Sequence, residues 1–175
     1  MIPNVTKGDG MRDVMVYLVT TDPEKTKNVH TEPHLVAGDA TVTAWFGDDE
    51  LDVAAAGEIA RVLNQPWKTY QVDVPGGHVW HGSLSIRAEE GRLGDEKWRA
   101  IAERFAEKMG FDGSDGKAPC RWVAVHHGLS KSGNDHIHFV ADRVREDGTK
   151  WNAWNDFRRA QEACRELEAL GVAVS

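Results

Sequence analysis

Histidines late in the chain have the type and spacing of metal ligands. His136 and His138 stand one residue apart, and a strand turns side chains at that spacing to the same face. The polar, glycine-containing stretch 128–135 is typical of a hairpin loop. Closing that hairpin brings His126 or His127 beside the pair. Three neutral imidazoles on one face can bind a divalent metal ion and leave positions open for a reaction, although a half-exposed hairpin can also carry histidines that bind nothing.

A tyrosine supplies the second chemical ingredient. The sequence has only two, Tyr17 and Tyr70. Tyr17 lies in a helical pattern at 11–19 but outside its apolar stripe. A phenol with a pKa near ~10 needs activation before it attacks phosphorus, and a metal ion that neutralises phosphate oxygens helps that attack. Tyr17 beside a histidine-bound metal therefore suits phosphodiester transesterification; ordinary helix packing is the alternative for this residue.

The elements that must position these residues follow from hydrophobic spacing. We expect strands at 2–7, at 78–86 and in both arms of the histidine hairpin, a long loop at 20–39, and helices at 11–19, at 48–63, at 95–109 and from 155 or 156 to 170. In the second hairpin arm, Ile137 and Phe139 alternate with the histidines and are expected to face the helices. This order predicts an α/β fold, a two-layer sandwich whose central antiparallel sheet has helices on one face and the histidine site on the other.

Composition narrows the class of protein. A chain of 175 residues with 41% hydrophobic and 28% charged residues fits one globular domain. A net charge of −7 argues against a general nucleic-acid coat but allows a local basic groove. Two widely separated cysteines favour a reducing compartment. With neither a long apolar run nor a signal peptide, we expect a cytoplasmic protein without membrane insertion.

Several stretches resemble the relaxase (mobilisation nuclease) domain of plasmid and integrative-element transfer proteins, in the HUH superfamily of single-strand DNA nucleases. The histidine motif, at 122–130 and 133–138, is the most specific likeness. Shorter likenesses to actinobacterial members lie at 1–8, 15–18 (the tyrosine motif), 32–38, 80–85 and 155–159. The resemblance implies an HUH relaxase-like fold and one relaxase domain over residues 1–175, in a class whose members usually continue into further domains.

The resemblance also implies roles for individual residues. Tyr17 would be the nucleophile that forms a 5′-phosphotyrosyl link and frees a 3′-hydroxyl, and His136 and His138 would be metal ligands. Asp135 would orient a ligand imidazole or receive the tyrosine proton; a plain turn residue is the alternative. His34 and His81 are further polar candidates for the groove.

The third ligand is open between two neighbours. Similar sequences often have Arg-His at 126–127, which implies His127. Strict alternation instead implies His126, if Val123 and Val125 face the helices. A twist or bulge at the strand end favours His127. We expect His127, with His126 contacting DNA or replacing the arginine.

Ligands and partners follow from the same resemblance. The implied cofactor is a divalent metal ion, Mg²⁺ or Mn²⁺ in the cell, with Zn²⁺ or Ni²⁺ in purified protein. The implied partners are single-stranded transfer-origin DNA, accessory transfer proteins and a type IV secretion coupling protein. Basic residues are expected to contact phosphates, or only to carry solvated charge: Lys131, Arg143, Arg145, Arg158 and Arg159.

The leading hypothesis is a metal-dependent enzyme that nicks and rejoins one DNA strand at a transfer origin. A rolling-circle replication initiator shares the same histidines and tyrosine, and differs in the fate of the nicked strand. A DNA-binding module without cleavage is the non-enzymatic alternative. A histidine-triad nucleotide hydrolase would need a further histidine at Val140.

Overall fold

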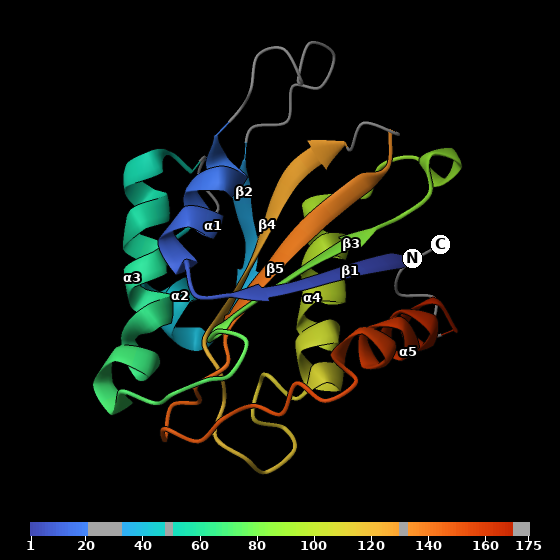
Figure 1. Cartoon of the computed structure of the whole chain (residues 1–175). Helices are drawn as coiled ribbons and strands as arrows, with labels where there is room; N and C mark the ends of the chain where they lie inside the picture. Colours follow the sequence, from blue (N-terminus) through green and yellow to red (C-terminus); the bar gives the residue numbers. More distant parts are fainter. Residues whose placement is uncertain (21–32, 48–50, 130–132, 170–175) are drawn as a thin grey trace.

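An antiparallel sheet of five strands forms the centre of the molecule. The computed structural model describes residues 1–20, 33–47, 51–129 and 133–169. The strands are β1 (Ile2–Gly8), β2 (His34–Gly38), β3 (Val79–Ser85), β4 (Trp122–Leu129) and β5 (Asp135–Asp142). They lie in the order β1-β3-β5-β4-β2, and every neighbouring pair is antiparallel (Figure 1). The two arms of the histidine hairpin, β4 and β5, are therefore central or next to central in the sheet.

Helices α1, α3, α4 and α5 pack against this sheet. The helices are α1 (Met11–Val19), α2 (Ala40–Trp45), α3 (Val53–Tyr70), α4 (Asp95–Met109) and α5 (Asp156–Ala169), with a 3₁₀ turn at Ala88–Glu90. Local sequence sets their ends: the Asp52 carboxylate caps α3 by accepting a hydrogen bond from the Ala55 amide. Gly110 ends α4 with φ 79°, in the left-handed region that favours glycine. None of the described helices is long and apolar enough to cross a membrane.

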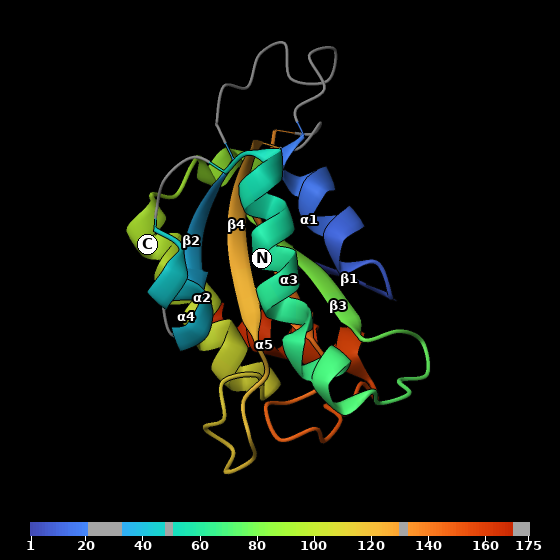
Figure 2. The same cartoon turned by 90° about the vertical axis from the view of Figure 1, so that its left-hand side faces the viewer.

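Two separate cores lie on opposite faces of the sheet. Figures 1 and 2 show the helices that cover these two faces. On one face Ile137 and Phe139 pack with α4 and α5 around the buried Trp80. On the other face Val123 and Val140 pack with α1 and α3. Because strand residues alternate between faces, His136 and His138 lie on the α1/α3 face, next to Val140.

The α/β class and the antiparallel sheet are confirmed. One part of the expected arrangement is wrong: the helices cover both faces of the sheet, so the histidine face is not helix-free. Apolar residues occur on both sides of β4, as expected for a strand buried on both faces. The alternation within a single strand therefore does not show that helices cover both faces of the sheet.

The segment expected as a loop at 20–39 contains a strand at its end. The buried run Leu35-Val-Ala37 forms β2, which pairs with β4 and completes the sheet. Its shortness, at five residues, hid it among polar neighbours. Helix α3 also continues to Tyr70 past Pro66, which the predicted end at 63 did not include.

Candidate metal centre and nucleophile

A β-bulge in β4 separates the two neighbouring histidines. His126 pairs with Ile137 and Gly128 pairs with His136, so His127 is an extra residue in β4. A bulge of this kind redirects side chains locally. His127 lies on the α1/α3 face with Val125, and His126 lies on the α4/α5 face with Ile137.

Three imidazoles gather on the α1/α3 face at the end of the hairpin. The ring centroids of His136 and His138 are 5.1 Å apart. The ring of His127 is 6.2 Å from that of His136 and 5.8 Å from that of His138. The structure therefore brings together the pair predicted from the H-x-H spacing and the neighbour favoured as their third member.

Hydrogen bonds fix the tautomers of two of these rings. His127 Nδ1 donates to the carbonyl oxygen of Leu18 in α1 at 2.6 Å, and His136 Nδ1 donates to the Asn134 carbonyl oxygen at 3.3 Å. Because a carbonyl only accepts, each ring carries its proton on Nδ1 and its lone pair on Nε2. One hydrogen-bonded ring nitrogen and one nitrogen with a free lone pair is a pattern typical of metal-binding histidines.

The third ring, His138, is held by another histidine. Its Nδ1 lies 2.9 Å from Nε2 of His81 in β3, so His81 can accept the Nδ1 proton and leave the His138 Nε2 lone pair for a ligand. Burial, followed by the neighbouring imidazoles, lowers the pKa of His138 to about 2. Burial also lowers the pKa of His136 and of His81. The rings of His138, His136 and His81 are therefore neutral near pH 7. A histidine must be neutral to bind a metal ion. Within the described chain, no Nε2 of His127, His136 or His138 makes a hydrogen bond.

His126 belongs to a different cluster, behind β4. Its Nε2 lies 2.7 Å from a carboxylate oxygen of Asp135, and its ring centroid is 5.4 Å from that of His34 in β2. His34 Nε2 in turn lies 2.8 Å from the carboxylate of Asp95, at the start of α4. Each of the residues His34, Asp95 and His126 offers one ligand atom, and these atoms lie within 4.8 Å of one another. These three residues could hold a metal ion.

Asp135 lies among partners on the α4 side. Its carboxylate accepts hydrogen bonds from the Leu93 amide at 2.8 Å, from Trp98 Nε1 at 3.0 Å and from His126. Burial alone raises the pKa of this carboxyl, but the hydrogen bonds more than offset that effect and leave the pKa lowered. The imidazole that Asp135 orients is therefore His126, and none of its hydrogen bonds reaches His127, His136 or His138.

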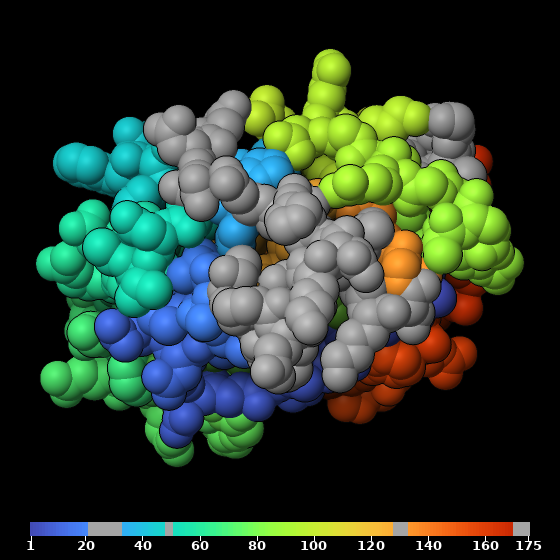
Figure 3. Space-filling model, turned by 90° about the horizontal axis from the view of Figure 1, so that it is seen from above, coloured from blue at the N-terminus to red at the C-terminus, as the bar shows by residue number. Residues whose placement is uncertain are grey.

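Tyr17 lies in the last turn of α1, immediately before Leu18. Its side chain is 67% exposed, as its position outside the apolar stripe of Met11, Met15 and Leu18 predicts. The neighbouring Leu18 carbonyl holds His127, so the tyrosine-bearing helix is tied directly to the histidine cluster. Figure 3 looks onto this end of the molecule, where parts of α1 and β5 reach the surface.

The structure gives most of the predicted phosphate-binding arginines internal roles. Arg143 is buried and donates to the carbonyl oxygens of Pro75 and Gly77. Arg145 is buried and donates to the Lys150 carbonyl. Arg159 donates to the Asn152 carbonyl and lies 4.8 Å from the centroid of the Trp151 ring.

Two predicted basic contacts differ from these. Arg158 has a side chain that is 73% exposed and pairs with Glu162 one helical turn away. Lys131 lies outside the described residues.

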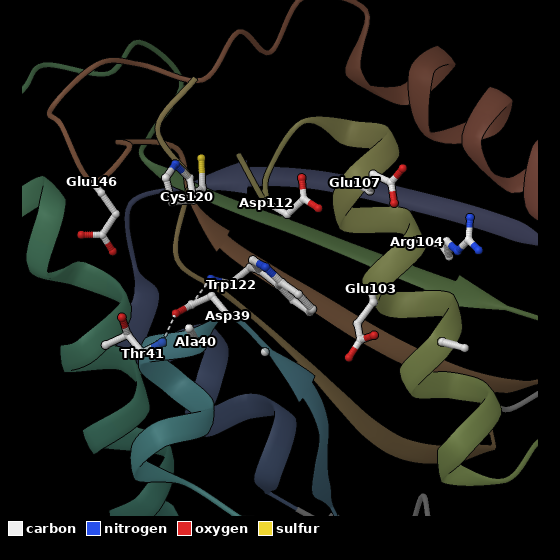
Figure 4. Close-up of a pocket in the computed structure, with 13 residues that line it drawn as sticks. Asp39, Ala40, Thr41, Glu103, Arg104, Glu107, Asp112, Cys120, Trp122 and Glu146 are labelled. Carbon is white, nitrogen blue, oxygen red and sulfur yellow. Dashed lines mark hydrogen bonds between the residues drawn. The ribbon is translucent and has the colours of Figure 1, made fainter. Parts of the chain in front are cut away.

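A sizeable pocket lies at the opposite end of the sheet from the histidines (Figure 4). Carboxylates from several elements line it, including Asp39, Glu103, Glu107, Asp112 and Glu146, with Arg104 beside them. Such a lining repels a phosphate backbone. The pocket is therefore unsuited to the DNA chemistry that the histidine end supports.

Sequence reasoning named His34 and His81 only as polar candidates for the groove, without their partners, and missed Asp95 as a member of the second cluster. His81 and His34 stand out only as polar residues, because their partners come from distant strands: β5 for His81 and, across β2–β4 pairing, His126 for His34. Asp95 reads as the start of a helix. The available signal was the His-x-Ser-x-Ser pattern at 81–85, whose alternate residues face the histidine side of β5.

A comparison with protein families matches residues 45–170 to "Relaxase: MobA/VirD2-like, nuclease domain". Searches of curated proteins and of solved structures found no match. The matched range includes the whole histidine hairpin, and begins after Tyr17 and His34. The chain therefore belongs to the family of MobA/VirD2-like relaxase nuclease domains, metal-dependent enzymes that nick DNA in mobilisation.

Proposed function

We propose that this chain nicks and rejoins single-stranded DNA at a transfer origin, with Tyr17 as nucleophile and His127, His136 and His138 as the ligands of a catalytic metal ion. The observation that carries the proposal is the hydrogen bond between His127 and the Leu18 carbonyl. It joins the helix that bears the tyrosine to the three-histidine cluster. Membership of the relaxase family supplies the reaction class.

The three histidines fit a metal ion by their donor chemistry, but among the described residues only His34, Asp95 and His126 have ligand atoms within 4.8 Å of one another. The rings of His127, His136 and His138 would therefore move closer together to hold an ion. The Nδ1 atoms of all three rings have hydrogen-bond partners, and three imidazole nitrogens leave coordination positions for phosphate oxygens. When bound, the ion would neutralise charge on the scissile phosphate and stabilise the leaving oxygen. Oxygen-rich substrates suit Mg²⁺ or Mn²⁺ in the cell, whereas the imidazoles bind Zn²⁺ or Ni²⁺ more tightly in purified protein.

The protein's own groups have distinct tasks in this proposal. The Tyr17 oxygen attacks phosphorus and its proton passes to solvent. The P–O bond to the 3′ oxygen breaks, and this oxygen takes up a proton from solvent. The products are a 5′-phosphotyrosyl bond and a 3′-hydroxyl, and rejoining is the reverse reaction. The exposure of the Tyr17 side chain leaves it accessible to a DNA strand. Asp135 acts as a positioning residue for His126 rather than as a proton acceptor.

Partners and location follow the proposed reaction. Transfer-origin DNA in single-stranded form is the proposed substrate, and Lys131, in the hairpin connection between the ligand strands, is the proposed phosphate contact. Accessory transfer proteins and a type IV secretion coupling protein are proposed partners in the cytoplasm. Residues 1–175 form one relaxase domain in this proposal.

The test uses the two tyrosines of the chain as a matched pair. Single-stranded oligonucleotides from the transfer-origin region next to the encoding gene are incubated with protein and Mn²⁺, then separated under denaturing conditions. Wild type and Tyr70→Phe should form a denaturation-resistant protein–DNA band, because Tyr70 donates to the Glu146 carbonyl far from the histidines. Tyr17→Phe should form none while still binding the oligonucleotide. An adduct on Tyr17→Phe would refute the tyrosine assignment.

The same assay, repeated with oligonucleotides from a replication origin, separates the other two functions. A non-catalytic binding module would bind the oligonucleotide, with affinity falling as salt rises, but would give no adduct in any variant. A replication initiator would form the adduct preferentially on a replication-origin strand.

A further inference from the structure

We propose a second metal site, formed by His34, Asp95 and His126 on the opposite face of the sheet from the three-histidine cluster, with Asp135 orienting His126. This site shares no ligand with the proposed catalytic centre. Its existence does not depend on the proposed reaction.

Three elements bring the ligands together. His34 in β2 and His126 in β4 are directly paired across the two strands, which places their side chains on the same face. Asp95 comes from the first turn of α4 and already contacts His34 Nε2 with both carboxylate oxygens, at 2.8 and 2.9 Å. One ligand atom of each residue lies within 4.8 Å of the others, a separation that a bound ion spans with modest side-chain adjustment.

An unpaired nitrogen on His126 gives an independent indication of a ligand. Nε2 of His126 is occupied by Asp135, and Nδ1 is buried without a hydrogen-bond partner among the described residues. The residue is only 4% exposed. A buried polar atom without a partner is unfavourable and calls for an explanation. A metal ion at Nδ1 provides one.

The surroundings of His126 match the pattern of a metal-binding histidine. Such a ring usually gives its other nitrogen to a carboxylate, which fixes the tautomer and raises the basicity of the ligand nitrogen. Asp135 fills this role, and is itself held by the Leu93 amide and Trp98 Nε1. The contacts therefore run from the Asp135 carboxylate through the His126 imidazole to the proposed metal.

The donor set indicates the metal. Two imidazole nitrogens and one carboxylate oxygen suit Zn²⁺, with water as a fourth ligand. Mg²⁺ and Ca²⁺ prefer oxygen ligands. A Zn²⁺ ion here would tie the edge strand β2 and the start of α4 to β4, directly behind the bulge that places His127.

The experiment first removes two of the three proposed catalytic ligands. The whole chain with His136→Ala and His138→Ala is loaded with Zn²⁺, dialysed, and its zinc content and thermal midpoint are measured. We expect about one zinc per protein and a midpoint that rises with Zn²⁺. Adding Asp95→Asn should weaken Zn²⁺ binding at least tenfold, because it removes the carboxylate ligand. The side chain of Asp95 is 53% exposed, so this change leaves the core intact.

Glu96→Gln is the matched control, since Glu96 is the next residue of α4 and exposed. It should leave the zinc content and midpoint unchanged. Zinc binding that is absent from the double variant, or that is equal with Asp95→Asn and Glu96→Gln, would overturn the second site. If the double variant does not fold, the wild-type protein gives the answer: Asp95→Asn and His34→Asn should each lower its zinc content by one ion, and unchanged content would overturn the proposal. Loss of DNA adduct formation in Tyr17→Phe is a separate result and bears only on the proposed reaction.

Discussion

His126 and His127 are consecutive residues whose rings serve opposite faces of the sheet. His127 Nδ1 donates to the Leu18 carbonyl of α1 at 2.6 Å, whereas His126 Nε2 contacts the Asp135 carboxylate at 2.7 Å on the α4 side. The bulge in β4 lies at this point. His127 therefore belongs to the proposed catalytic centre, and His126 belongs to the cluster on the opposite face of the sheet.

This division predicts different effects of two alanine substitutions. His127→Ala should reduce metal-stimulated DNA cleavage by about 100-fold or more, because it removes one of three proposed ligands. His126→Ala leaves those ligands in place and should mainly lower stability, by about 1–3 kcal/mol, since the buried Asp135 loses a partner. Cleavage assays on folded protein and chemical denaturation measure the two effects. Equal cleavage loss in both variants would contradict the division.

His81 should tune the metal affinity of His138. His81→Leu removes the acceptor for the His138 Nδ1 proton, and loss of such an outer partner typically weakens metal binding about 10–100-fold. His81→Gln can still accept through its side-chain oxygen and should lose less. Calorimetric titration with Mn²⁺ compares the two. Equal affinities for the Leu and Gln variants would show that the hydrogen bond has no part in metal binding.

Arg143 should contribute to stability and not to DNA affinity. Its guanidinium is buried and donates to the Pro75 and Gly77 carbonyls, so Arg143→Ala leaves two acceptors unpaired and should cost about 2–4 kcal/mol. The exposed Arg158 pairs only with Glu162 among the described residues, and Arg158→Ala should change stability by less than about 0.5 kcal/mol. Urea unfolding checks both values. A large drop in oligonucleotide affinity for folded Arg143→Ala would restore its role as a phosphate contact.

The sequence predicted the positions of most helices and strands, but not which face of the sheet each helix covers. Spacing of apolar residues located α1, β3, α4, β5 and α5, because each carries a strong period of its own. Strand alternation also paired His136 with His138. Alternation left the third ligand open, because the answer depended on the face that Val123 and Val125 occupy. Those residues pack under α1 and α3, on the same face as His136 and His138. With that face known, alternation points to His127.

The rest of the site depends on contacts between distant parts of the chain. Nothing near His81 indicates that β3 will lie beside β5, and nothing near Asp95 indicates that β2 will bring His34 to it. The bulge at His127 is equally invisible in a strand pattern, because it is defined by pairing with β5. Such relationships come from strand order, which periodicity does not determine.

His78 should make stability depend on pH in the acidic range. It is buried, its ring stacks on Trp67 with centroids 3.9 Å apart, and its Nε2 contacts the Asn64 side chain at 2.8 Å. Burial lowers the pKa of His78 from 6.5 to about 4. Between these values the unfolded chain binds a proton that the folded protein does not, so this residue makes stability fall as pH falls from about 6.5 to about 4. The size is about 2–4 kcal/mol at 1.36 kcal/mol per pKa unit.

Asp142 opposes this trend, because burial raises its pKa from 3.8 to about 7 and the folded protein then holds a proton that the unfolded chain has lost. The contribution of His78 is therefore the difference between wild type and His78→Gln, measured by urea unfolding at pH 7.5, 5.5 and 4.5. The variant should be less stable than wild type at pH 7.5, since it loses the stacked ring. That deficit should shrink toward pH 4.5, because glutamine does not titrate. A deficit that stays constant across the three pH values would show that His78 has the same proton affinity in the folded and unfolded chain.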